Sequence, residues 1–161
     1  MPDMGISRNS TDQEIKRKFK EISERIENAM IMGMQRLGEE MLNYTKSIPA
    51  AIGYTDRTGA LRSSTGYLLL VNGEIVKANF ERVEGPEATE IDGTKIGRAF
   101  ADKIAKQFNE GFVLVFVAGM DYALAVESKG RDVLTSTEIM ANSKVPEELL
   151  KLKEMVKVMK I

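Results

Sequence analysis

The amino-acid sequence predicts a single domain of the α+β class. Residues 11–48 carry one long helical pattern, and two short strand patterns joined by Asn72-Gly73 follow a loop. After a second helical pattern, the apolar run Phe112–Ala118 has the β-branched and aromatic composition of a buried strand. The chain has 161 residues, a common size for one compact domain. We therefore expect a disordered start at 1–10, the long helix at 11–48, an α+β core at 49–135 and a C-terminal helical extension at 136–161.

The composition excludes several classes of protein and site. Hydrophobic residues make up 43% and charged residues 29%, as in soluble globular proteins, and no apolar run approaches the roughly 20 residues of a membrane-spanning helix. Cysteine and histidine are absent, which excludes thiolate chemistry, Ser-His-Asp catalysis and the usual zinc sites. A net charge of -1 argues against general nucleic-acid binding. We expect no cofactor, no membrane partner and no export, since the N-terminus lacks a secretory pattern.

The long helix begins with a predicted capping box formed by Thr11 and Glu14. Apolar residues then recur at steps of three and four, which indicates one stripe to bury. At this length the helix spans about 55 Å and is longer than a compact core of this size. It therefore either bends, with Gly33 and Gly38 as the expected positions, or projects at one end. The stripe packs on the chain's own sheet or, in its N-terminal half, on a neighbouring subunit.

A loop rich in small and polar residues follows Pro49, and within it residues 57–64 have a specific pattern. Two arginines flank a glycine turn, and Leu61 is expected to hold the loop in the core. Arg57 and Arg62 are candidates for a partner or subunit contact, because guanidinium groups form strong paired bonds with carboxylates. The alternative is that they bind Glu or Asp of the same chain or are solvated.

The two strand patterns form a predicted hairpin, because Asn72-Gly73 supplies the positive φ angles of a type I′ turn. The regular register of such a turn pairs Leu69 with Val76. One face, with Leu69, Val76, Ala78 and Phe80, is then predicted to be core. The other face is predicted to contact the long helix or another chain, and its candidate contact residues are Leu68, Leu70 and Ile75.

Residues 81–92 are acidic and have no helical or strand period, so we expect an exposed, mobile loop. Most such loops are simply solvated. In the functional alternative, Glu84, Glu87 and Glu90 face DNA that must slide past without binding. The ligand spacing of a calcium loop is missing, so no metal site is predicted.

The second half of the chain predicts a helix over residues 95–109, with Ile96, Phe100, Ile104 and Phe108 in a row at steps of four. The apolar run that follows is expected to be the central strand, buried on both faces. A final helix is predicted from Pro146, because proline is favoured in the first turn.

Catalytic candidates are few. Asp121, Tyr122 and Glu127 lie next to the end of the apolar strand, and two carboxylates can share acid and base roles when burial raises one pKa. The structural alternative is that Asp121 caps a turn and Glu127 binds a nearby cation. The chain has no glycine-rich phosphate loop or nucleotide motif.

Two segments resemble one protein family. Thr58-Gly59-Ala60-Leu61-Arg62-Ser63-Ser64 is similar to a TG-x-LR-x-S segment, and Tyr122-Ala123 with Val126-Glu127 and Gly130 is similar to a YA-x-x-VE-x-G segment. Both occur in minor tail and head-to-tail connector proteins of long-tailed bacteriophages and prophages, and the similarity covers residues 11–134. The acidic loop and the extension after Thr135 depart from that pattern.

The resemblance implies a non-enzymatic virion component that joins the head to the tail or completes the tail tube. Such proteins have a small α+β fold and assemble as homo-oligomeric rings, commonly of six. Implied partners are other copies of the chain and other neck or tail proteins, with DNA passing through the ring without specific binding. The expected location is the cytoplasm of the bacterial host and then the virion. Two alternatives stay open: an enzyme that uses Asp121 and Glu127, and an adaptor or chaperone that binds a partner through the long helix.

Overall fold

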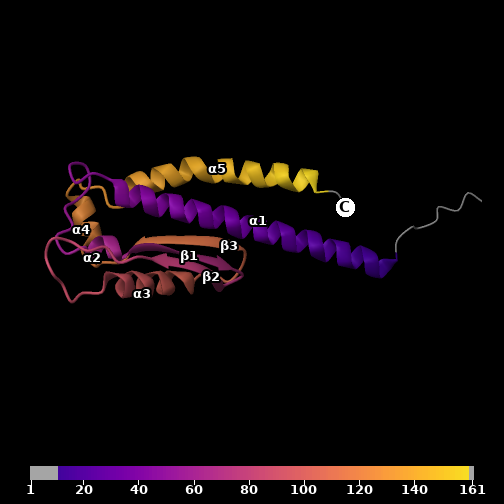
Figure 1. Cartoon of the computed structure of the whole chain (residues 1–161), viewed down its shortest axis with the longest axis horizontal. Helices are drawn as coiled ribbons and strands as arrows, with labels where there is room; N and C mark the ends of the chain where they lie inside the picture. Colours follow the sequence, from indigo (N-terminus) through magenta and orange to yellow (C-terminus); the bar gives the residue numbers. More distant parts are fainter. Residues whose placement is uncertain (1–10, 160–161) are drawn as a thin grey trace, which may run out of the picture.

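The computed structural model describes residues 11–159 and has the predicted α+β class. The expected disorder of residues 1–10 lies outside the described residues. In chain order the elements are α1 (Asp12–Ser47), α2 (Ala60–Ser63), β1 (Thr65–Val71), β2 (Glu74–Phe80), α3 (Gly93–Ala105), β3 (Phe112–Ala118), α4 (Ala123–Ser128) and α5 (Thr135–Val158). The three strands form one antiparallel sheet, with α1 and α3 on its opposite faces (Figure 1).

The middle strand of the sheet is β1, since the order is β2-β1-β3. The prediction that Phe112–Ala118 is the central strand is therefore wrong: β3 is an edge strand, and its first half is only partly buried. Every residue of β1 is buried. Both strands are apolar on both sides because helices cover both faces of this narrow sheet, so composition does not distinguish the centre from the edge.

The hairpin turn is as predicted, with φ of 50° at Asn72 and 83° at Gly73. The register beyond the turn differs from the prediction, because a bulge follows the pair Leu70 and Ile75 and sets Leu69 opposite Lys77. One extra residue on β2 reverses the side to which the rest of that strand points. Ala78 and Phe80 consequently share the α3 face with Leu68 and Leu70, whereas Lys77 and Asn79 share the α1 face with Leu69.

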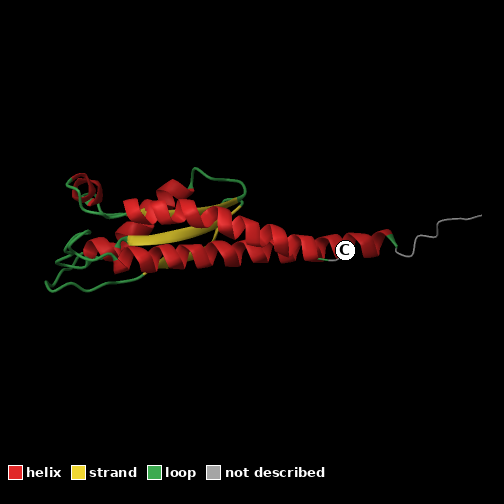
Figure 2. Ribbon diagram, turned by 90° about the horizontal axis from the view of Figure 1, so that it is seen from above, coloured by secondary structure: helices red, strands yellow, loops and turns green. Residues whose placement is uncertain are grey.

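Helix α1 runs without interruption for 36 residues, and its capping box is confirmed by the two bonds between Thr11 and Glu14. The predicted alternative of a projecting end is the one observed: α1 extends past the sheet and past the end of α5 (Figures 1 and 2). All of its buried residues lie in the C-terminal part, from Leu37 to Thr45. Gly38 lies under the ring of Tyr67, where an added Cβ would be 3.0 Å from ring carbons. This glycine serves close packing rather than a bend.

Helix α3 faces the sheet with its smallest residues. Gly93, Gly97, Ala101 and Ala105, at steps of four, are buried, while Ile96 and Phe100 of the predicted apolar row are 39% and 44% exposed. A Cβ on Gly97 would be 2.2 Å from the carbonyl oxygen of Ser64, so the backbones are in contact. Close approach to the sheet therefore selects the small-residue face.

Helix α5 begins at Thr135, one residue before the predicted helical extension at 136–161, but Pro146 lies in its interior rather than at a helix start. It runs antiparallel to α1 (Figure 1). Three polar contacts join the two helices: a hydrogen bond of 2.6 Å between the buried hydroxyls of Thr45 and Thr137, an ion pair of Lys144 with Glu40 at 3.7 Å, and an ion pair of Arg36 with Glu148. Because α5 contacts α1 on both sides of Pro146, through Lys144 before it and Glu148 after it, the proline does not terminate the helix.

Candidate functional site

The segment that carries the first motif is a tight turn held by Asp56. One carboxylate oxygen of Asp56 accepts from the backbone N–H of Gly59 at 2.9 Å, and the other accepts from the N–H of Arg62 at 2.7 Å. Gly59 has φ of 78°, and a Cβ there would be 1.9 Å from the carbonyl oxygen of Val83. The turn thus requires glycine for both conformation and space. Leu61, 1% exposed, packs into the core as predicted.

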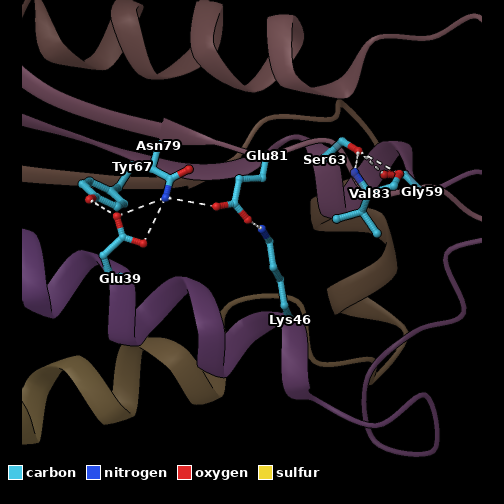
Figure 3. A network of polar contacts seen from close by, with 8 residues as sticks. All are labelled: Glu39, Lys46, Gly59, Ser63, Tyr67, Asn79, Glu81 and Val83. Carbon is cyan, nitrogen blue, oxygen red and sulfur yellow. Dashed lines mark hydrogen bonds and ion pairs between the residues drawn. The ribbon is translucent and has the colours of Figure 1, made fainter.

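The acidic loop is tied to this turn. The hydroxyl of Ser63 accepts from the N–H of Val83 at 2.8 Å and donates to the carbonyl of Gly59 at 2.7 Å (Figure 3). The N–H of Glu87 donates to the carbonyl of Arg57 at 2.8 Å. Gly85 also lies against the turn, since an added Cβ would be 2.3 Å from the carbonyl oxygen of Arg57. The first part of the loop therefore has a defined course over residues 57–63.

The two arginines bind within their own chain. Arg57 donates from Nε to Glu87 Oε1 at 2.7 Å and also pairs through Nη2 at 2.6 Å. The guanidinium carbon of Arg62 lies 5.5 Å from the centre of the Tyr54 ring. Arg57 thus follows the alternative of a carboxylate partner in the same chain, whereas Arg62 packs on an aromatic ring, which neither alternative described. Their contact with a neighbouring copy stays a prediction, and Arg57 is the more available, with 73% of its side chain exposed.

The structure contradicts two of the three apolar contact residues. Leu68 and Leu70 are 0% and 1% exposed and pack with Ala101, Ala105, Val115 and Val117 between the sheet and α3. They are core because β1 is the middle strand. Ile75 is 41% exposed, since it lies on the edge strand β2, and stays a candidate.

The acidic residues of the loop are not equivalent. Glu87 is paired with Arg57, whereas Glu84 and Glu90 are exposed and have no polar partner among residues 11–159. The loop encloses a hollow of about 350 Å³ against residues 58–63 and the start of α3. Within the described residues, no group of three or more acidic side chains is arranged to hold a metal ion.

The carboxylates next to β3 have different surroundings. Asp121 is exposed. Glu127 Oε1 accepts from the N–H groups of Leu134 and Thr135, at 3.1 and 2.8 Å, and from the Thr135 hydroxyl at 2.6 Å. Burial opposes ionisation, but these bonds hold the pKa of Glu127 below its usual value. Glu127 therefore caps the start of α5. This role is structural, but it differs from the predicted pairing of Glu127 with a nearby cation.

A second hollow, of about 290 Å³, lies beside the turn and is lined in part by Tyr54, Asp56 and Tyr122. Burial and the nearby charge of Asp56 raise the pKa of Tyr54 to about 12, and the same two causes raise that of Tyr122. Both phenols thus stay protonated at neutral pH and act as hydrogen-bonding groups rather than bases. Asp56 is not among the residues predicted from the sequence, although Asp three residues before Gly is a typical turn pattern.

The third group of interest fastens α1 to the sheet (Figure 3). Glu39 accepts from the hydroxyl of Tyr67 at 2.6 Å and from the side-chain amide of Asn79 at 3.0 Å to each oxygen. Lys46 donates to Glu81 at 2.6 Å, and this bond lowers the pKa of Glu81. The network joins α1 to β1 and to the end of β2, so it orients the long helix relative to the sheet.

The two motif segments meet in space. Ser64 of the first segment binds the two residues that lie shortly before the second: its carbonyl accepts from the N–H of Gly119 at 3.1 Å, and its hydroxyl accepts from the N–H of Met120 at 3.2 Å. Leu61 and Ala60 of the first segment share a core cluster with Ala123 of the second, and Val126 of the second packs against this cluster. Segments more than fifty residues apart therefore form one packed unit.

A search of family models, of curated proteins and of solved structures gives no match for this chain. Among residues 11–159, no helix is long and apolar enough to cross a membrane.

Proposed function

We propose that the protein is a non-enzymatic structural component of a phage or prophage virion, which joins head to tail or completes the tail tube by assembling with copies of itself in a ring. The observation that carries the proposal is the contact between the two motif segments, in which Ala60 and Leu61 share a core cluster with Ala123. Residues that share a motif because they build one structural unit are expected to contact each other. A chance similarity of two short segments gives no such expectation.

The surface around this unit supports the proposal. The turn and the loop present Arg57, Glu84 and Glu90 at one end of the molecule, and Ile75 is exposed on an open sheet edge. A ring subunit needs polar and apolar contact groups on a rigid body, and a lumen through which DNA passes is expected to be acidic rather than basic. We therefore assign the contacts to Arg57, Arg62 and Ile75, and the lumen to the acidic loop.

The first test is the mass of the purified protein by light scattering over a range of concentrations, with negative-stain microscopy of the largest species. We expect rings, and we expect Ile75→Asp to reduce them. Ile139→Asp is the matched control, because Ile139 is 66% exposed on α5, a different element. A protein that stays monomeric and also fails to bind a purified phage portal or tail tube would contradict the proposal.

A second candidate function is an adaptor that binds a partner helix, and the projecting part of α1 favours it (Figure 1). The two candidates differ in which variants matter. An adaptor loses its partner when the projecting helix is changed and is insensitive to Ile75→Asp. The enzyme alternative is weaker, since Glu127 already has a structural role at the start of α5.

A further inference from the structure

The end of α1 that projects from the molecule has an apolar stripe that no other element among residues 11–159 covers. We call residues 12–26 the free end of α1. Ile15, Phe19, Ile22 and Ile26 recur at steps of four, three and four, which places them on one side of the helix. Phe19 is 57% exposed, and the three isoleucines are only partly buried. A surface helix of a soluble protein is expected to bury such a stripe.

The stripe continues the face of α1 that binds α5. That face is marked by Arg36 and Glu40, which pair with Glu148 and Lys144 of α5. These two pairs fix how the antiparallel helices align. If the same alignment is continued along α1, the last residue of α5, Val158, lies about level with Ile26. Figure 1 shows α1 running on beyond that point. The occupant that fits the free end is therefore another helix, seated as α5 is seated further along.

The charges beside the stripe define the chemistry of that helix. Lys18 and Arg25 flank the stripe on one side, one heptad apart, and Lys16 lies on the other. Among residues 11–159 none of these three cations has a carboxylate partner. On the far side of the helix, by contrast, cations are paired within α1, Arg17 with Glu21 at 3.7 Å and Lys20 with Glu24 at 3.9 Å.

We propose that the free end of α1 binds an amphipathic helix of a partner protein, through an apolar stripe flanked by Asp or Glu. A second copy of the same segment is a poor occupant, because its own flanks are basic and like charges beside a helix seam oppose pairing. The proposal goes beyond ring assembly, which is assigned to Arg57, Arg62 and Ile75 rather than to residues 12–26, and it holds whether or not the rings form.

The test uses the full-length protein and two synthetic helices of about three heptads, with Leu and Ile at the seam positions. One has Glu at all flanking positions and the other has Lys. Neither pairs with itself at neutral pH, because its flanking charges repel. We expect the acidic helix to bind, by fluorescence anisotropy at low salt, about tenfold more tightly than the basic one.

Variants separate the stripe from its flanks. Ile22→Ser is expected to weaken binding of the acidic helix by tenfold or more, because it removes a central apolar contact. Lys18→Glu with Arg25→Glu is expected to reverse the preference, so that the basic helix binds more tightly; a misfolded protein does not produce such a reversal. Arg17→Glu with Lys20→Glu is the matched control on the far side and is expected to keep the preference for the acidic helix.

Four results would overturn the proposal. They are equal binding of both helices, no binding of either, binding to vesicles of anionic lipid that Ile22→Ser abolishes, and a change of oligomeric mass in Ile22→Ser. The last would show that the stripe is occupied by a second copy. None of these results bears on whether Ile75→Asp disrupts rings, so the two proposals fail independently.

Discussion

The two ends of the molecule differ in how far their apolar residues are buried. At the packed body, which comprises the sheet, α2, α3, α4 and the C-terminal part of α1, β1 is buried along its whole length and glycines bring backbones into contact. At the free end of α1, the same helix presents Phe19 and its neighbours to solvent. One helix therefore serves as core at one end and as an open surface at the other, and substitutions are expected to separate the two.

The largest expected effect is in the packed body. Leu70→Ala removes a side chain that is 1% exposed and leaves a cavity between β1 and α3, so we expect a loss of about 2 to 5 kcal/mol in the free energy of unfolding. Ile75→Ala, on the neighbouring edge strand, is expected to cost much less, about 1 kcal/mol. Urea unfolding followed by circular dichroism measures both. Equal costs would contradict the assignment of Leu70 to the core and Ile75 to the surface.

The next largest effect on stability is expected at two helix glycines, with opposite signs in α3 and in α1. Gly97→Ala places a Cβ 2.2 Å from the Ser64 carbonyl oxygen, and we expect a loss of about 1 to 3 kcal/mol. Gly33→Ala, in α1, places its Cβ 3.7 Å from Glu148, an ordinary contact, and is expected to gain up to about 1 kcal/mol from helix propensity. Thermal unfolding is the measurement. A stabilising Gly97→Ala would mean that the approach of α3 to β1 is looser than described.

Local patterns predicted the elements of the fold better than their arrangement. The capping box of Thr11 and the turn at Asn72-Gly73 depend on a few neighbouring residues, and both are confirmed. The bulge in β2 depends on the pairing with β1, so the sequence of β2 alone does not specify it. Ala78 and Phe80 were placed on the wrong face of the sheet for this reason, whereas Leu68 and Leu70 were taken for a contact surface because the order of strands is a long-range property.

In the helices, too, local sequence patterns predicted that an element is present but not how it packs. In α3 two adjacent rows have helical spacing, and only the position of Gly119 against Gly97 decides that the small row faces inward. Pro146 was read as a helix start, but packing of α5 on α1 overrides that local preference. At the candidate site, Arg57 and Arg62 were found from their motif, whereas Asp56, which positions the turn, lies just outside it.

A smaller effect is expected at the start of α5, where the packed body joins the helix that accompanies α1. Glu127→Gln weakens the cap on Leu134 and Thr135, and we expect a loss of about 1 kcal/mol at pH 7. Asp121→Asn is the matched control and is expected to change stability by less than about 0.5 kcal/mol. If the protein is instead an enzyme that uses Asp121 and Glu127, both Glu127→Gln and Asp121→Asn are expected to abolish its activity, although only Glu127→Gln lowers stability.

The pH dependence of this cap has a defined sign. Because the pKa of Glu127 is lower in the folded chain than in the unfolded one, the unfolded chain binds more protons as the pH falls through the range of free glutamate. The stabilisation is therefore complete above the usual pKa of glutamate and is lost as the pH falls through the lowered folded value. The difference in stability between the wild type and Glu127→Gln is expected to shrink in acid. A difference that grows in acid would contradict the role of the carboxylate as acceptor.

The smallest effect on stability is expected at Arg57, and this makes it the best probe of the contact surface. Its pair with Glu87 is exposed on both sides, at 73% and 50%, so Arg57→Ala is expected to cost about 0.5 kcal/mol or less. Arg62→Ala, which loses its packing on Tyr54, is expected to cost about 1 kcal/mol. Chemical unfolding and light scattering on the same samples measure both properties. Since Arg57→Ala leaves the fold intact, a loss of rings in that variant reports on the contact itself, and unchanged rings would remove Arg57 from the interface.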